Sequence, residues 1–344
     1  MRSVAEGMAF GRVNLLGEHL DYNNGCVFPL QINRSIKVKT SRIADKKIIE
    51  ITSDYFNQTI TTSNINNKNN NWSDYVIGCC FVANEFKSIQ TYGLSFTIHS
   101  DLPIGVGLSS SAAVCIATLR SIFNFFDIEI KNNDLVLLAQ KVEQDFVGVG
   151  GGIMDQFVSV YGNQKQALFL NTANNSYELI NIPSDYSFLI VNSGIKRELS
   201  SSLFNERKQE CYNAASKLNI KFLCDLNQIN NKYKSILTEN EFKRCIHVVL
   251  ENNRTKQART SLLNNDMGQF GKLMTESHHS LKDNYEVSSK ELDFLVETCI
   301  ANGALGAKLT GAGFGGAIVT LIQNDFVEGL KEYILKNYSS AKFI

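Results

Sequence analysis

Apolar and polar residues alternate with a period of two in several short segments of the first hundred residues. Such alternation is typical of β-strands with one buried face. It predicts strands at Ile36–Ser41, Lys47–Ser53, Gln58–Thr62 and Ser95–His99. A separate apolar group, Val13, Leu15 and Leu16, predicts a buried strand that carries Arg12 to an interior edge.

Further along the chain, apolar residues recur every three or four positions, which is the period of a helix packed on a core. This spacing predicts helices at Ala112–Phe126 and Asp134–Phe146, the second with Asp134 as its N-cap. The same spacing resumes from Met154 to Tyr161, and Ala317–Ile322 is a predicted strand. The order of elements indicates a mixed α and β protein.

The chain has 344 residues, which favours two domains over one hydrophobic core. Pro183 and Ser184 interrupt the pattern just before the apolar run Phe188–Val191. We therefore predict one domain over residues 1–183 and a second over residues 184–344.

Charge and cysteine content exclude several classes of protein. Lysine plus arginine and aspartate plus glutamate both number 34, so the strongly basic surface of nucleic-acid or membrane-surface binders is not expected. The sequence shows neither a secretory apolar core at its start nor an apolar run of about 20 residues, the length of a membrane span. The eight cysteines form no Cys-x-x-Cys pair and no small-domain disulfide pattern, which favours reduced thiols in the cytoplasm.

The first chemical motif is Gly11–Gly25, where an arginine, a histidine and two carboxylates gather around glycines. Glu18, His19 and Asp21 follow a glycine at which the chain can turn sharply. Carboxylates accept hydrogen bonds from sugar hydroxyls, and Arg12 can hold an anion or keep an acid ionised. The motif therefore favours a polyhydroxylated ligand, and the alternative is a solvated turn with ordinary charges.

The second motif, Pro103–Ala113, contains two glycines and three serines at the start of a predicted helix. Unpaired amides and the positive end of the helix dipole would favour phosphate there, and a serine hydroxyl can also bind magnesium. The segment is neither a Walker loop nor a dinucleotide fingerprint, because the lysine of one and the third glycine of the other are absent. The alternative is a serine N-cap on an ordinary core helix.

The third motif, Gly148–Phe157, places Asp155 in the first turn of a predicted helix, where the helix dipole favours the ionised carboxylate. This is a suitable position for a base. Glu143 borders the buried face of the preceding helix and is a candidate metal ligand. The alternatives are a helix-start carboxylate and a surface charge.

A last glycine-rich segment, Lys308–Gly316, precedes the strand predicted at Ala317–Ile322. Its four glycines allow close packing against the phosphate loop or a ligand, and the alternative is a tight turn into the strand.

These motifs resemble those of galactokinases, which belong to the small-molecule kinase superfamily that includes homoserine and mevalonate kinases. The three superfamily motifs occur in the expected order, and Gly-Glu-His-x-Asp-Tyr with Gly-Ile-Met-Asp-Gln-Phe is more specific to galactokinases. The resemblance also extends through Trp72–Tyr75, Asn192–Cys211 and Ser277–Asp293. It implies an α+β, two-domain GHMP kinase fold, with an N-terminal domain like the second domain of ribosomal protein S5 and a C-terminal ferredoxin-like α/β sandwich domain.

The resemblance further implies transfer of the ATP γ-phosphoryl group to the anomeric hydroxyl of galactose. Asp155 matches the catalytic base and Arg12 its partner. The positions that match the sugar site are Glu18, His19, Leu20, Asp21, Gly152 and Phe204. The positions that match the triphosphate site are Gly105, Val106, Gly107, Leu108, Ser109, Ser110 and Ser111, with Ser111 and Glu143 as magnesium ligands. The implied partners are a small sugar and ATP, with no nucleic acid, no membrane and no obligate protein partner.

Three positions depart from the pattern of the family, the first being Phe10, which stands where a proline is usual before Gly11. Phe204 stands where a tyrosine is usual, and Leu20 stands where a threonine is usual. Loss of one hydroxyl should weaken or redirect sugar recognition by about 0.5–1.5 kcal/mol. The sequence therefore leaves open an anomeric kinase for a related sugar, such as an N-acetylhexosamine or a pentose, and a catalytically silent sugar sensor.

Overall fold

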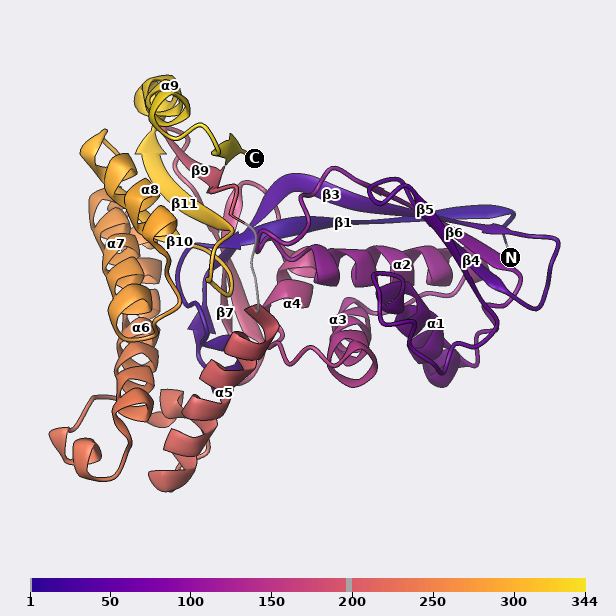
Figure 1. Cartoon of the computed structure of the whole chain (residues 1–344), viewed down its shortest axis with the longest axis horizontal. Coiled ribbons are helices and arrows are strands. Elements are labelled where there is room, and N and C mark those ends of the chain that lie inside the picture. The colour runs from indigo at the N-terminus through magenta and orange to yellow at the C-terminus, as the bar shows by residue number, and fades with distance from the viewer. Residues whose placement is uncertain (1, 196–199) are drawn as a thin grey trace. The chain divides into compact units, whose positions relative to one another are not determined.

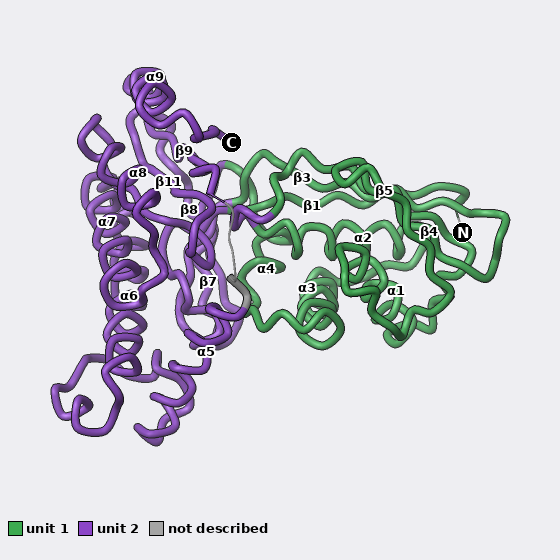
Figure 2. Tube along the Cα trace, in the orientation of Figure 1, with its two compact units in different colours: residues 1–12, 31–104, 109–164 green, residues 13–30, 105–108, 165–344 purple. Residues whose placement is uncertain are grey.

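A computed structural model of the chain describes residues 2–195 and 200–344. These residues form two compact units, each discontinuous in sequence (Figure 2). Unit 1 consists of Met1–Arg12, Gln31–Ile104 and Ser109–Gln164. Unit 2 consists of Val13–Leu30, Gly105–Leu108 and Lys165–Ile344.

The compact units do not divide where the sequence predicted a domain boundary. Pro183 lies inside unit 2, between strands β8 (Ser176–Asn181) and β9 (Tyr186–Asn192). Strand β8 pairs with β7 (Gln166–Asn171), which in turn pairs with β2 (Cys26–Val27). This three-stranded sheet ties residues 166–181 to unit 2, because the ladder hydrogen bonds run from one strand to the next.

Unit 1 is built on a five-stranded sheet with the order β1-β3-β6-β4-β5. Its strands are β1 (Val4–Asn14), β3 (Pro29–Arg42), β4 (Ile49–Ser53), β5 (Gln58–Thr62) and β6 (Leu94–Ser100), which confirms the predicted strands. Ile36, Val38 and Thr40 of β3 are buried, whereas Lys37 and Lys39 between them are exposed. The sheet therefore has one core face, as its alternation of residues indicates.

Helices cover that core face of unit 1 (Figure 1). They are α1 (Asp74–Lys87), α2 (Ser110–Phe126), α3 (Asn132–Lys141) and α4 (Met154–Tyr161). Helix α2 approaches β1 very closely at Gly7, where an added Cβ would lie 2.1 Å from the Ala117 carbonyl oxygen. Only glycine fits at this crossing.

The helix predicted over Asp134–Phe146 is not continuous. Helix α3 ends at Lys141, and the chain continues as the π-helical turn η2 (Val142–Val147). The predicted N-cap is also wrong, because Lys131 caps the helix and Asp134 lies in its first turn. A π-turn widens the helix by one residue and changes the direction of the side chains that it carries, among them Glu143.

Unit 2 contains a four-stranded sheet with the order β10-β11-β9-β12. Its strands besides β9 are β10 (Gly306–Leu309), β11 (Ala317–Gln323) and β12 (Lys342–Phe343). The register places Val319 of β11 between Lys308 of β10 and Ile190 of β9. The helices are α5 (Ser200–Lys217), α6 (Glu239–Leu263), α7 (Met267–Asp283), α8 (Lys290–Ala301) and α9 (Val327–Asn337).

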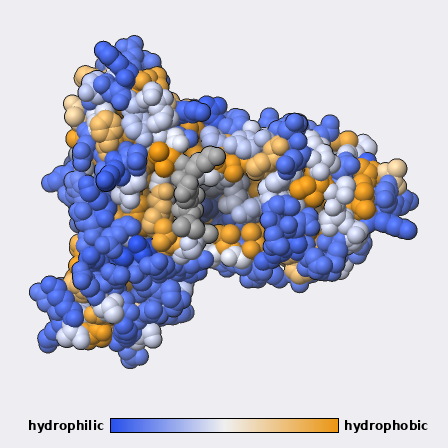
Figure 3. All heavy atoms as spheres, viewed as in Figure 1, coloured by the Kyte–Doolittle hydropathy of each residue, from blue (hydrophilic) through white to orange (hydrophobic). Residues whose placement is uncertain are grey.

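Hydrophilic residues cover most of the face drawn in Figure 3, and hydrophobic residues occur there in small groups. Single exposed apolar side chains, such as Phe326 at 53%, are usual on a protein surface. No helix in the described part of the chain combines the length and the apolar character needed to cross a bilayer.

Candidate active site

Arg12 and Asp155 form an ion pair within unit 1, although 143 positions separate them in sequence. Strand β1 carries Arg12 into the interior, and the first turn of α4 carries Asp155. Arg12 Nε donates to Asp155 Oδ1 at 2.8 Å, and an Nη of the same guanidinium lies 2.6 Å from that oxygen. The Arg12 side chain is 5% exposed and that of Asp155 is 29% exposed. The carboxylate is thus held in place while it stays accessible to a small molecule.

Two hydrogen-bond donors of unit 1 hold the carboxylate of Glu143. Its buried carboxylate accepts hydrogen bonds from Ser111 and from the Gln156 side-chain amide. Burial raises the pKa of Glu143 to about 7, and the hydrogen bond from Ser111 opposes this shift. Gln156 Oε1 is buried and has no hydrogen-bond partner among the described residues. Ser111 and Glu143 are therefore adjacent, as a shared cation would require.

The glycine–serine loop has a backbone suited to an anion. Gly105 and Gly107 have positive φ angles of 78° and 86°, and Ser109 has a φ of 62°. Ser109 is the N-cap of α2, but its side chain makes no capping hydrogen bond. Its hydroxyl is buried and has no partner within the described part of the chain. Ser109 thus occupies the N-cap position without a capping bond from its side chain, and its hydroxyl remains available to a ligand at the start of the helix.

In unit 2, the chain turns sharply after β1 at Gly17, with a φ of 93°, and at His19, with a φ of 63°. Glu18, which lies between these two residues, is buried and its carboxylate pairs with the ammonium group of Lys308, which is itself fully buried. The Gly311 amide also donates to Glu18 Oε1 at 3.3 Å. The last glycine-rich motif thus packs against the first motif through the Glu18 carboxylate.

The other predicted sugar residues of unit 2 lie around His19. Asp21 begins the short 3₁₀ helix η1 (Asp21–Asn23) and is half-buried. Half-buried Phe204, on α5, places its ring 5.6 Å from the His19 ring. Leu20 is completely buried, so its side chain supplies packing instead of a polar contact. Gly152 belongs to unit 1, where it is half-buried two residues before α4.

Sequence models of known families match three parts of the chain. Residues 8–42 match a galactokinase galactose-binding signature, residues 74–163 the N-terminal domain of GHMP kinases, and residues 258–339 their C-terminal domain. Galactokinase from Thermococcus kodakarensis is 36% identical over 96% of this chain and 93% of its own length. The chain belongs to the galactokinase family.

Other members of the galactokinase family and of the wider fold agree with this assignment. Galactokinase from Streptococcus thermophilus is 38% identical over 96% of this chain and 88% of its own length. The crystal structure of Lactococcus lactis galactokinase complexed with galactose superposes with a TM-score of 0.93 at 33% identity, covering 100% of this chain and 93% of that one. Methanococcus jannaschii mevalonate kinase shares the fold, with a TM-score of 0.71 at 23% identity, covering 100% and 97% of the two chains. The predicted α+β GHMP kinase fold is confirmed.

Some residues of this galactokinase-family site carry no signal in the sequence. Lys308 belongs to a quoted motif, but nothing in the motif identifies it as the partner of Glu18. Gln156 and Tyr285 look like ordinary polar positions of a helix and a loop. Tyr285 is fully buried and its hydroxyl bonds that of Tyr22 at 2.8 Å. Contacts across such sequence separations depend on the tertiary fold.

Acid is expected to destabilise this member of the galactokinase family from about pH 6.5 downward. His247 is buried, and burial lowers its pKa from 6.5 to about 4. Between these values the unfolded chain binds a proton that the folded protein does not, so stability is lost as the pH falls. From pH 6.5 to 5 this costs about 2 kcal/mol of unfolding free energy for His247 alone.

Chemical unfolding at a series of pH values measures this loss. His247→Gln should flatten the profile between pH 6.5 and 5, whereas His279→Gln, on an exposed histidine, should leave it unchanged. An identical slope in the wild type and in His247→Gln would contradict the assignment.

Proposed function

We propose that this protein is an ATP-dependent galactokinase, which transfers the γ-phosphoryl group of ATP to the anomeric hydroxyl of galactose. The products are galactose 1-phosphate and ADP. The observation that carries the proposal is the Arg12–Asp155 pair, in a chain that matches galactokinases over 96% of its length. The galactose-binding signature at residues 8–42 includes Arg12 and the turn at Glu18.

Asp155 is proposed to accept or orient the proton of the anomeric hydroxyl. Its carboxylate is held by Arg12 and remains partly exposed, so it can meet a hydroxyl without rearranging. Arg12 is proposed to stabilise the negative charge that develops as the oxygen attacks phosphorus. Phosphoryl transfer of this kind depends mainly on positioning and charge stabilisation.

The sugar is proposed to bind through the first motif and its neighbours. Glu18, His19 and Asp21 offer the polar groups, while Leu20 shapes the turn through its packing. The backbone of Gly152 and the ring of Phe204 complete the proposed set. Carboxylates and a neutral imidazole recognise hydroxyl groups by directed hydrogen bonds, which suits a hexose.

ATP and magnesium are proposed to bind through the glycine–serine loop. The residues from Gly105 to Ser111, which include Val106, Leu108 and Ser110, would hold the phosphates. The unpartnered Ser109 hydroxyl fits this role, and the adjacent Ser111 and Glu143 fit a magnesium ion. The described residues contain no cluster of three His, Cys, Asp or Glu side chains that could hold a metal. When bound, magnesium neutralises phosphate charge.

A kinase for a related sugar is the second candidate, because Phe204 lacks the hydroxyl that is usual in the family. A panel of galactose, glucose, N-acetylgalactosamine and arabinose, assayed for ADP release with ATP and magnesium, separates the two candidates. The galactokinase proposal requires galactose to have the highest kcat/KM. Preference for another sugar by tenfold or more would favour the second candidate, and no turnover with any sugar would favour a silent sensor.

Phe204→Tyr is expected to raise kcat/KM for galactose about 2- to 10-fold, the value of one added hydrogen bond. The ring already lies beside His19, so a hydroxyl is added without moving the backbone. Phe326→Tyr, on an exposed phenylalanine, is the matched control. If Phe204→Tyr changes kcat/KM for galactose no more than this control does, Phe204 does not contribute to sugar selection.

We also propose a cytoplasmic location, because all eight cysteines are free thiols, which persist in reducing compartments. A sugar and ATP are the partners that the proposed reaction needs.

A further inference from the structure

A chain of buried hydrogen bonds leads to His19 from three side chains of unit 2 that the proposed mechanism does not use. His19 Nδ1 lies 2.7 Å from the Tyr22 hydroxyl, and this hydroxyl lies 2.8 Å from that of Tyr285. The Tyr285 hydroxyl in turn lies 3.1 Å from Cys211 Sγ. All four side chains are at most 5% exposed. The other ring nitrogen of His19, Nε2, is buried and has no side-chain hydrogen-bond partner in the part of the chain that the structure describes.

The chemistry of these groups sets the direction of the chain. Each hydroxyl and the thiol has a single proton to donate, so the donor to His19 Nδ1 decides the donors of the other two contacts. A phenol is a strong donor and a neutral imidazole nitrogen is a strong acceptor, which favours Tyr22 as donor to His19 Nδ1. Tyr285 then donates to Tyr22, and the Cys211 thiol donates to Tyr285. The Asn23 side chain also bonds the Cys211 sulfur, and as an amide donor it leaves the thiol proton for Tyr285.

The imidazole of His19 is neutral in the folded protein. Burial lowers the pKa of His19 well below 6.5, and repulsion from His247 adds to this effect, while the backbone of Ala312 opposes it. Burial likewise raises the pKa of the Tyr22 hydroxyl well above 10, so this group keeps its proton. A neutral imidazole that accepts at Nδ1 carries its single proton on Nε2.

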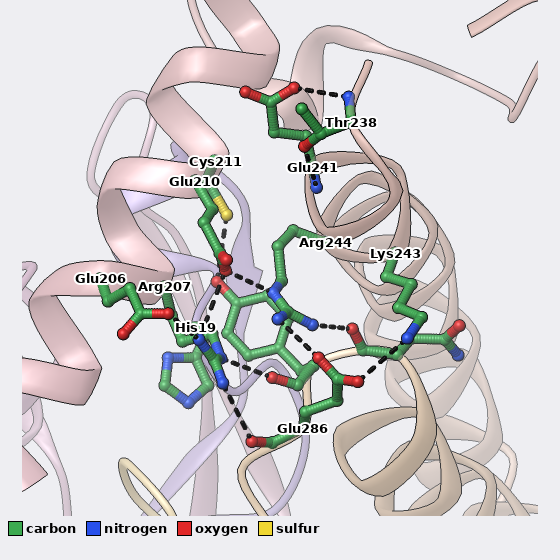
Figure 4. Close-up of polar contacts among 12 residues, drawn as sticks. His19, Glu206, Arg207, Glu210, Cys211, Thr238, Glu241, Lys243, Arg244 and Glu286 are labelled. Atoms are coloured by element: carbon green, nitrogen blue, oxygen red, sulfur yellow. Dashed lines mark hydrogen bonds and ion pairs between the residues drawn. The ribbon is translucent and has the colours of Figure 1, made fainter. Parts of the chain in front are cut away.

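Two arginines, Arg207 and Arg244, hold Tyr285 in position through the backbone, and both are labelled in Figure 4. Arg207 Nε donates to the Tyr285 carbonyl at 2.9 Å. Arg244 is fully buried, donates to the neighbouring Asn284 carbonyl and pairs with Glu210 at 2.6 Å and Glu286 at 2.7 Å. The Tyr285 ring also packs between those of His19 and His247, at 4.5 Å from each. Tyr285 is thus fixed by its backbone and by its ring.

We propose that Tyr22 and Tyr285 are positioning residues that fix His19 in the tautomer with its proton on Nε2, so that His19 donates a hydrogen bond to a sugar hydroxyl oxygen. The part that concerns the sugar rests on the proposed function, whereas the tautomer is a property of the ligand-free protein. A neutral donor of this kind selects an oxygen acceptor without requiring a charged ligand.

Nitrogen-15 NMR of the ligand-free protein with labelled histidine tests the tautomer directly, and the spectrum of His19→Gln assigns the His19 signals. The wild type is expected to show a protonated Nε2 and an unprotonated Nδ1. Tyr22→Phe removes the donor to Nδ1, so the other tautomer should become populated. Tyr233→Phe, on a half-buried tyrosine of unit 2 outside the hydrogen-bond chain, should leave the signals unchanged. A wild-type His19 protonated on Nδ1 would overturn the proposal.

Steady-state kinetics test the link to the sugar. Tyr22→Phe should raise KM for galactose about tenfold, with kcat and KM for ATP within about twofold of wild type, because one directed hydrogen bond is lost. Cys211→Ser keeps a donor to Tyr285 and should behave as wild type. An unchanged galactose KM in Tyr22→Phe, alongside a shifted tautomer, would overturn the sugar contact. A wild type without galactokinase activity would overturn the proposed function and leave the tautomer assignment intact.

Discussion

Asp155→Asn is expected to lower kcat for galactose phosphorylation about 10³-fold, within the 10²–10⁴-fold range of general acid–base catalysis. Asparagine has nearly the same shape as aspartate, but it cannot take a proton from the anomeric hydroxyl. The substitution also removes the negative charge that Arg12 holds at 2.6 Å. The fold of unit 1 should survive, because the Asp155 side chain is 29% exposed and α4 does not depend on it for a capping hydrogen bond.

The matched control for this prediction is Asp134→Asn, on an acidic residue in the first turn of α3. It changes the same charge in the same unit and should leave kcat within about twofold of wild type. A loss of less than tenfold in Asp155→Asn would mean that Asp155 does not act as a base. In that case the rate would depend on Arg12 and on the phosphate site.

Lys308→Met is expected to destabilise the protein by about 3–5 kcal/mol, the cost of removing one partner from a buried ion pair. Glu18 is 2% exposed and Lys308 is fully buried, so the carboxylate would remain without its cation and without water. Lys308 also donates to the Leu309 carbonyl at 2.9 Å and to the Asn14 carbonyl at 3.4 Å. Its loss would therefore loosen the contact between the first and last glycine-rich motifs.

Chemical unfolding of the variant measures this effect. Lys308→Met combined with Glu18→Gln should recover at least half of the lost stability, because no buried charge is then left unpaired. Lys331→Met removes a lysine from the exposed pair with Glu328 and should cost less than about 1 kcal/mol. Equal losses in Lys308→Met and Lys331→Met would show that the buried pair does not hold the motif in place.

Local patterns were sufficient to predict most of the elements. The strands at residues 36–41, 49–53 and 95–99 follow from alternation because each has buried positions on one face, and the edge strand at 58–62 was also predicted although none of its residues is buried. The prediction of a continuous helix beyond the end of α3 was wrong for a different reason. Apolar spacing does not distinguish an α-helix from a π-turn of six residues, so the direction of Glu143 could not be predicted.

Only part of the candidate site could be predicted from the sequence. Glycines and serines around residue 107 predict a phosphate loop from local chemistry alone. The pairing of Arg12 with Asp155 spans 143 positions, and only the resemblance to galactokinases indicated it. The sequence could not predict that Lys308 pairs with Glu18, nor the hydrogen-bond chain at Tyr285. Such buried polar contacts depend on which side chains the tertiary fold brings together.

Identification of the product by phosphorus-31 NMR tests the central claim most directly. The purified protein is mixed with galactose, ATP and magnesium, and the reaction is followed until ATP is consumed. Transfer to the anomeric hydroxyl predicts a stoichiometric resonance of a sugar phosphate whose phosphorus couples to the anomeric proton, together with ADP, and neither signal with Asp155→Asn over the same time. Phosphate on any other hydroxyl, or no sugar phosphate from the wild type, would contradict it.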